Sequence, residues 1–158
     1  MSEPPTAPLQ VYIIAGEASG DKLGAGLMQA LRKAWGMDVS FTGVGGELMQ
    51  EEGLQSLFPI TELSLMGLAE VLPHIPRLRR RILETVKDIQ SQKPDIVVTI
   101  DSPGFCFRVG RRLKPGSIPI VHYVAPSVWA WKPSRAKKVS VFLDGLLTLL
   151  PFEPPYFE

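Results

Sequence analysis

The sequence contains few of the residues that build disulfide frameworks and metal sites. Cysteine occurs once, at Cys106, and histidine twice, at His74 and His122. A single cysteine excludes an internal disulfide and fits a reducing compartment, and we expect Cys106 to be a small buried hydrophobe. Two histidines without a cysteine partner do not make a zinc site, so we expect no metal.

The sequence also lacks an excess of charge of either sign and a long hydrophobic run. The 17 Lys and Arg residues nearly balance the 16 Asp and Glu residues, which excludes bulk attraction to nucleic acid. The longest apolar stretch, 145–152, is far shorter than the ~20 residues that span a bilayer. Residues 1–8 have neither the basic nor the apolar part of a secretory signal. We therefore expect a cytoplasmic protein that lies at most on a membrane surface.

What is present is typical of one folded α/β domain. The 158 residues are 45% hydrophobic and 21% charged, which excludes wholesale disorder; we expect a disordered tail over 1–9 and a folded domain over 10–158. Short apolar runs predict strands at 11–15, 39–43, 57–58, 94–101, 118–123 and 146–150. Their alternation with helices predicts a parallel sheet covered on both faces, a Rossmann-like doubly wound fold.

The expected helices follow from apolar spacing. The first has one apolar face, formed by Leu23, Leu27, Ala30, Leu31 and Ala34. Its expected N-cap is Asp21 or Ser19. A short helix is expected over 47–52, and others near 110–113 and over 135–142. A longer helix has an inward face formed by Leu78, Ile82, Val86 and Ile89.

Ligands of open parallel sheets bind outside the carboxyl ends of the strands, which selects 16–21, 43–46, 101–105 and 125–131. The first two loops lack the glycine spacing of a Walker A loop and of a dinucleotide-binding loop. Glu17 and Asp21 make the first loop unsuited to a bare phosphate, so a sugar hydroxyl or an amine fits it better. A tight strand-to-helix turn explains the glycines of both loops equally well.

Asp101 is the sharpest single candidate, because a carboxylate that closes a buried strand is held by rigid backbone and can act as a general base. A turn acid or a helix cap is the alternative. His122 is either a structural histidine or a hydrogen-bonding group near the site. No serine lies in a G-x-S-x-G elbow, which argues against a serine nucleophile.

Two further stretches combine aromatic or apolar residues with cations. Trp129 and Trp131 precede a basic segment and suit sugars, phosphates or single-stranded nucleic acid, of which nucleic acid fits the neutral charge least; core anchoring is the alternative. Between 63 and 81 an apolar run meets an arginine cluster, as expected of a surface that docks on anionic membranes. A core helix with an arginine rim is the alternative there.

The motifs together resemble the lipid-A-disaccharide synthase family. They are Ala15-Gly-Glu-Ala-Ser-Gly-Asp21, Gly43-Val-Gly-Gly46, Leu65-Met-Gly-Leu-Ala-Glu-Val-Leu72, Ile100-Asp-Ser-Pro-Gly-Phe105, His122-Tyr-Val-Ala-Pro-Ser-Val-Trp-Ala-Trp131 and Leu149-Leu-Pro-Phe-Glu153. The resemblance spans about residues 10–158, and the motifs fall in the family's order. It implies the acceptor-binding N-terminal half of a GT-B glycosyltransferase.

The family's reaction, by this resemblance, transfers 2,3-diacylglucosamine from its UDP carrier to 2,3-diacylglucosamine 1-phosphate. It forms the β-1,6 disaccharide of lipid A with inversion, needs no metal or cofactor, and takes place at the cytoplasmic face of the inner membrane of Gram-negative-type bacteria. Asp101 matches the general base. The implied substrate-binding residues are Gly16, Glu17, Ser19, Gly20, Asp21, Gly45, Gly46, His122, Ser127, Trp129 and Trp131. The implied membrane-facing residues are Leu65, Met66, Leu68, Leu72, Arg77, Arg79, Arg80 and Arg81.

Two departures from the family bear on activity. The family commonly has Ile-Asp-Ala-Pro-Asp-Phe where this sequence has Ser102 and Gly104, so a second carboxylate near Asp101 is missing. The sequence ends at Glu158, about where the UDP-binding half would begin, so we expect it to be inactive alone and to need a separate C-terminal half. The alternatives are a non-enzymatic module that docks on membranes or binds acylated sugar phosphate, and, less favoured, a nucleotide-binding oxidoreductase domain.

Overall fold

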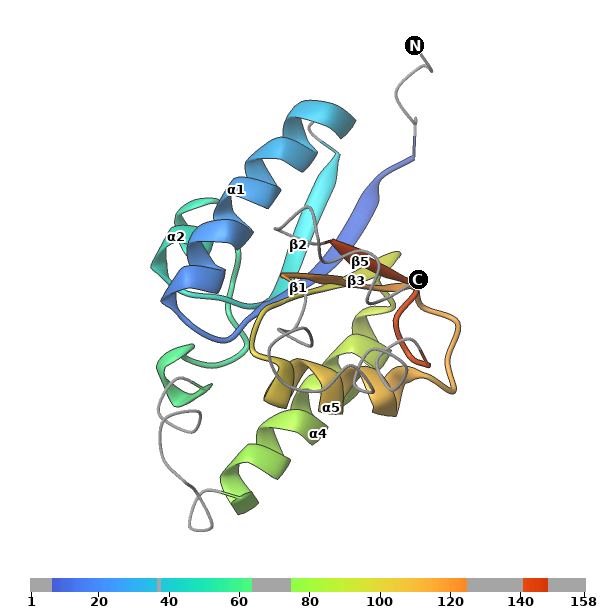
Figure 1. Cartoon of the computed structure of the whole chain (residues 1–158). Helices are drawn as coiled ribbons and strands as arrows, with labels where there is room; N and C mark the ends of the chain where they lie inside the picture. Colours follow the sequence, from blue (N-terminus) through green and yellow to red (C-terminus); the bar gives the residue numbers. More distant parts are fainter. Residues whose placement is uncertain (1–6, 37, 64–74, 125–140, 148–158) are drawn as a thin grey trace.

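The computed structural model describes residues 7–36, 38–63, 75–124 and 141–147. In this part of the chain a parallel sheet lies between two pairs of helices (Figure 1). Helices α1 (Ala18–Trp35) and α2 (Glu47–Glu51) cover one face, and α4 (Ile75–Gln92) and α5 (Pro103–Leu113) cover the other. The Rossmann-like doubly wound α/β fold is therefore confirmed. Most of the helix expected over 135–142 lies outside the described residues.

The sheet has the order β2-β1-β3-β4-β5, and every neighbouring pair is parallel. Its strands are β1 (Leu9–Ala15), β2 (Val39–Val44), β3 (Ile96–Ile100), β4 (Ile120–Tyr123) and β5 (Gly145–Leu147). The chain runs outward from β1 to β2 and then returns to the other side of β1 as β3. The loops that leave β1 and β3 therefore diverge at a topological switch point, where open sheets of this kind bind their ligands.

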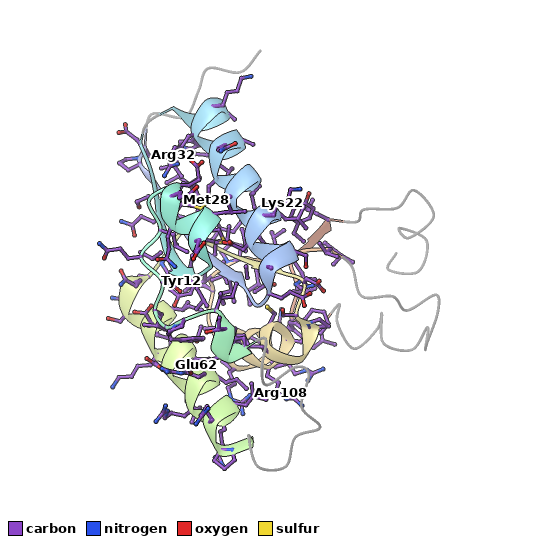
Figure 2. The ribbon with its side chains drawn as sticks, turned by 90° about the vertical axis from the view of Figure 1, so that its left-hand side faces the viewer. Tyr12, Lys22, Met28, Arg32, Glu62 and Arg108 are labelled. Atoms are coloured by element: carbon purple, nitrogen blue, oxygen red, sulfur yellow. The ribbon has the colours of Figure 1, made fainter. Side chains whose placement is uncertain are left out.

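Strand β1 is apolar and buried from Val11 to Ala15 because both of its faces are covered there. Val11, Ile13 and Ala15 pack with the core beneath α1 and α2, which includes Met28. Tyr12, on the opposite face, packs with the core beneath α4 and α5 (Figure 2). Its hydroxyl donates a hydrogen bond to Asp88 Oδ2 at 2.7 Å, so this buried phenol is satisfied.

Helix α1 differs from its expected form in cap and in face. It begins at Ala18, so neither Asp21 nor Ser19 is its N-cap; that position belongs to Glu17, which makes no side-chain cap bond. The expected face is confirmed only in part: Leu23, Leu27 and Leu31 are partly buried and pack against the core, whereas Ala30 and Ala34 are exposed. The buried residues of the helix are Gly20, Asp21, Gly24, Ala25 and Met28. Small residues let this face approach the sheet and α2 closely, and an apolar count that omits glycine misses it.

Two predictions about the strands were also wrong. Residues 57–58 form no strand; the chain makes a single parallel bridge there, between Gly43 and Ser56. Phe58 instead turns into the core, where its ring meets the edge of Phe105. Strand β1 begins at Leu9, inside the expected tail. The helix expected near 110–113 is confirmed; it is α5, which begins at Pro103 and so follows β3 almost directly.

Candidate functional site

The candidate site lies where β1 and β3 end side by side. Ala15 is paired with Ile100 at the last position of the register, so the residues that follow them are brought together. A Cβ on Gly16 would overlap the side chain of Ser102, and the absence of a side chain at 16 lets the two loops touch. Asp101 donates its backbone N–H to Tyr123 O at 2.9 Å, which fixes the end of β3 to β4.

Asp101 and Ser102 turn the chain sharply from β3 into α5. Both have left-handed backbone conformations, with φ of 49° and 42°. The N–H groups of Phe105 and Cys106 donate to Ser102 O at 3.1 and 3.0 Å, which closes the first turn of α5. The turn keeps Asp101 half-buried at the edge of the sheet rather than on a flexible loop. This is the placement expected for a general base.

Glu17 lies against Asp101, and their carboxyl groups are in hydrogen-bonding contact. This hydrogen bond is the main cause that raises the pKa of Glu17; partial burial and the negative charge of Asp101 raise it further. Ser19 Oγ donates to Glu17 Oε1 at 3.3 Å and opposes the rise. The loops thus bring together Gly16, Glu17, Ser19 and Asp101, four of the residues selected from the sequence.

His122 is fully buried beneath this edge, and its ring lies across the ladder from Thr99. His122 Nδ1 and Thr99 Oγ1 are 2.6 Å apart, and Nε2 has no hydrogen-bond partner among the described residues. Burial lowers the pKa of His122 to about 4, although the charge of Asp101 acts in the opposite direction. Sequence reasoning missed Thr99, whose signal was a polar residue within an otherwise apolar strand, two residues before Asp101.

Asp21 lies in α1 but serves α2. Its Oδ1 accepts hydrogen bonds from the N–H groups of Gly46 at 2.8 Å and Met49 at 3.1 Å, and its Oδ2 accepts one from Leu48 at 3.1 Å. A Cβ on Gly46 would lie 2.6 Å from Asp21 Oδ2, so a glycine is needed there. Gly20 and Gly45 are also buried. These contacts give the four residues a structural role, and substrate binding by them stays a prediction.

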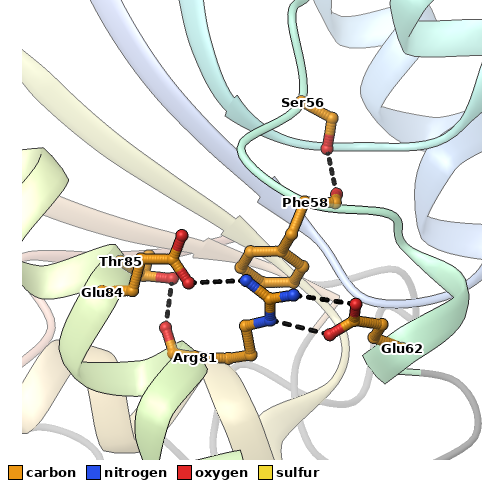
Figure 3. Close-up of polar contacts among 6 residues, drawn as sticks. All are labelled: Ser56, Phe58, Glu62, Arg81, Glu84 and Thr85. Atoms are coloured by element: carbon orange, nitrogen blue, oxygen red, sulfur yellow. Dashed lines mark hydrogen bonds and ion pairs between the residues drawn. The ribbon is translucent and has the colours of Figure 1, made fainter.

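Arg81 is held inside the protein by two carboxylates and an aromatic ring (Figure 3). Its Nε and Nη2 donate to Glu62 at 2.7 and 2.8 Å, and its Nη1 donates to Glu84 at 2.7 Å. The guanidinium lies 4.7 Å from the centre of the Phe58 ring. The Arg81 guanidinium is therefore already paired with carboxylates of the protein, and its membrane-facing role stays a prediction.

The other arginines of this cluster differ from Arg81. Arg77, Arg79 and Arg80 are exposed on the first half of α4, as expected of a membrane-facing surface. Among the residues that the structure describes, no helix is long and apolar enough to cross a membrane. The remaining membrane-facing candidates, Leu65, Met66, Leu68 and Leu72, lie outside the described residues, as do Ser127, Trp129 and Trp131.

The described part of the chain holds no group of three or more His, Cys, Asp or Glu residues that could bind a metal ion. The Cys106 thiol is fully buried next to the site, and burial raises its pKa. A buried thiol of raised pKa is a poor nucleophile and a poor ligand. The chemistry that the described residues support is proton transfer at the carboxyl pair of Glu17 and Asp101.

Comparison with known proteins gives consistent matches over almost the whole chain. The sequence model of a family described as "Lipid-A-disaccharide synthetase" matches residues 11–158. A protein of Rhodospirillum centenum named "Lipid-A-disaccharide synthase" is 58% identical over 153 residues, which are 96% of this chain and 38% of that protein. Proteins of the same name from Paramagnetospirillum magneticum and Ruegeria pomeroyi are 57% and 56% identical, covering 94% and 95% of this chain and 38% and 37% of their own length. The chain thus spans a little over a third of the length of these relatives.

Proposed function

The chain belongs to the lipid-A-disaccharide synthetase family, and on that premise we propose that it is the acceptor-binding part of a glycosyltransferase of lipid A biosynthesis. The proposed reaction transfers 2,3-diacylglucosamine from UDP to 2,3-diacylglucosamine 1-phosphate and forms a β-1,6 bond with inversion. The UDP of the donor is bound chiefly by a second domain, in line with the length of the relatives.

The observation that carries the proposal is the position of Asp101. It follows the central strand β3 at the switch point, half-buried, with its backbone fixed to β4. Inversion at a sugar carbon requires a base that takes the proton from the attacking hydroxyl. Asp101 fills this role in our proposal, and the neighbouring loops over 16–19 line the space for the acceptor sugar.

The proposed base can be tested in a full-length enzyme made by joining residues 1–158 to the remaining part of the Rhodospirillum centenum relative. Transfer from UDP-2,3-diacylglucosamine is measured with the acceptor in mixed micelles. Asp101→Asn should lower kcat by about 10²–10⁴-fold, the usual contribution of a positioned base. Asp95→Asn is the matched control, because Asp95 lies at the opposite end of β3, where its side chain accepts the Gln10 N–H. An Asp101→Asn enzyme of normal rate would refute the assignment.

We further propose that α4 brings the acylated acceptor to the site from an anionic membrane surface, the cytoplasmic face of the inner membrane. The exposed cations Arg77, Arg79 and Arg80 support this docking, each worth about 1 kcal/mol near an anionic surface. Their replacement by glutamine should reduce co-sedimentation with phosphatidylglycerol vesicles at least about tenfold. The matched control replaces three exposed lysines, Lys33, Lys87 and Lys93. If both triple variants lost the same amount of vesicle binding, the loss would reflect only the lower positive charge of the protein. That result would refute the proposed docking surface on α4.

The same measurements separate this function from a non-enzymatic module. Saturable binding of 2,3-diacylglucosamine 1-phosphate, without turnover in the joined enzyme, would favour a module that binds acylated sugar phosphate. The Leu68→Glu, Leu72→Glu double variant adds a sequence-based check, since it should release the protein from anionic vesicles. Unchanged binding of that variant would end the membrane proposal.

A further inference from the structure

Glu17 and Asp101 come from different crossovers, and the fold brings their carboxyl groups together. Strands β1 and β3 are paired up to Ala15 and Ile100, and Gly16 allows the next residues of the two chains to touch. Glu17 has an extended backbone, with φ −156° and ψ 171°, at the position just before α1. Two carboxyl groups in hydrogen-bonding contact need one proton between them, because two carboxylates only accept.

The other titratable groups near the pair do not neutralise it. Cys106 on α5 and His122 on β4 both sense the charge of Asp101. Burial raises the pKa of the Cys106 thiol and lowers the pKa of His122 to about 4, so both are neutral near pH 7. Asp21 on α1 is turned away towards the N–H groups of α2. The described interactions that set the Glu17 pKa come only from Asp101, Ser19 and burial.

We propose that Glu17 is a positioning residue that shares a proton with Asp101 and so sets the pH range in which Asp101 works as a base. This inference rests on the proposed function. In that reaction the acceptor oxygen forms a bond to the anomeric carbon, the bond from that carbon to the UDP oxygen breaks with its electron pair, and the hydroxyl proton passes to Asp101. A protonated Glu17 occupies an Asp101 oxygen through its hydrogen bond. An ionised Glu17 leaves that Asp101 oxygen free. Its negative charge also repels the Asp101 carboxylate, which favours transfer of a proton to Asp101.

The pair can be tested without any substrate, by following the side-chain carboxyl carbons of the 158-residue chain by ¹³C NMR against pH. Glu17 should titrate above its ordinary range, in two linked steps. Asp101→Asn should lower the midpoint of Glu17, because the carboxylate that accepts its hydrogen bond and the neighbouring negative charge are both removed. Ser19→Ala, a milder change, should raise the midpoint, because Ser19 donates to Glu17. Asp95→Asn is the control that leaves it unchanged. A single step at the ordinary value, unmoved by Asp101→Asn and Ser19→Ala, would overturn the inference.

The consequence for catalysis is tested in the joined full-length enzyme with Glu17→Gln. Its amide donates to Asp101 at every pH and so imitates the protonated partner. We expect kcat at pH 7.5 to fall roughly three- to tenfold, the KM for the acceptor to stay within about twofold, and the acid limb of the rate profile to lose its upper step. A raised KM with an unmoved acid limb would make Glu17 a sugar ligand and overturn its positioning role. Normal transfer by Asp101→Asn, with the NMR coupling intact, would instead refute the proposed function alone.

Discussion

The contact between Asp21 and helix α2 makes a strong prediction for stability. Asp21 is 6% exposed and accepts three backbone hydrogen bonds, from Gly46, Leu48 and Met49. These N–H groups belong to the start of α2, whose own N-cap residue is a glycine and supplies no side-chain acceptor. Asp21→Ala removes the acceptor and leaves the N–H groups of Gly46 and Met49 buried without a partner.

The size of the loss follows from these bonds. A hydrogen bond to a charged acceptor contributes about 1.5–3 kcal/mol, and three bonds to one carboxylate are not additive. We therefore expect Asp21→Ala to lower the free energy of unfolding by about 3–5 kcal/mol. Asp21→Asn keeps one oxygen for the two bonds that Oδ1 accepts and should lose only about 1–2 kcal/mol. The alanine loss is a large part of the about 5–15 kcal/mol that stabilises a typical domain.

The assay is urea unfolding of the 158-residue chain followed by circular dichroism. Glu47→Ala is the control, because Glu47 is an exposed acid in the first turn of α2, where its charge contributes at most about 1 kcal/mol. If Asp21→Ala lost no more than Glu47→Ala, the carboxylate would not be the structural acceptor described here. A folded and stable Asp21→Ala chain would then return Asp21 to the list of candidate substrate ligands.

Three further perturbations test other contacts. A double-mutant cycle of Arg81→Met and Glu62→Gln, measured by urea unfolding, should give a coupling free energy of about 1–2 kcal/mol. The pair is bidentate, and its side chains are only 15% and 27% exposed. A coupling free energy of zero would contradict the pairing. Because the pKa of His122 is about 4 in the folded state and about 6.5 unfolded, the unfolded chain binds the extra proton, and stability should fall by about 2 kcal/mol between pH 7.5 and 5. His122→Gln should remove that part of the pH dependence, and an unchanged slope would refute it. Gly16→Ala should lower the free energy of unfolding by about 1–3 kcal/mol, because its Cβ overlaps the Ser102 side chain, and adding Ser102→Gly should restore most of that loss. A Gly16→Ala chain of unchanged stability would contradict the close approach of the two loops.

The sheet could be predicted because its signal is local. The run 11–15 is apolar without interruption, as is typical of strands buried on both faces, and it is followed at once by Gly16. The face of α1 could be predicted only in part, through Leu23, Leu27 and Leu31. Gly20 and Gly24 form the closest approach of the helix, and their contribution is the room they leave for Met49 and for β3. That contribution is invisible to a count of apolar side chains.

Sequence reasoning could predict which loops form the site, from the topology of the sheet, but not which side chains are paired across the fold. The rule for strand ends selected Asp101 and the loop that contains Glu17, and the structure places the two carboxyl groups in contact. The partner of Asp21 could not be predicted, because it lies 25 residues further along the chain and is a set of backbone N–H groups. The pairing of Arg81 could not be predicted for a similar reason, since its partner Glu62 lies 19 residues earlier in the chain.

The turn at Asp101 and Ser102 links the fold to the proposed chemistry. Two successive residues with left-handed backbones cost about 1–3 kcal/mol each, and such strain persists only where the surroundings enforce it. Here the enforcing contacts are the Asp101 N–H to Tyr123 O on β4 and the Cys106 N–H to Ser102 O in α5. A relaxed loop would avoid the strain but would let Asp101 move away from Glu17 and into solvent. The strained turn therefore holds Asp101 next to Glu17, which is the condition for Glu17 to act as the positioning residue that we propose.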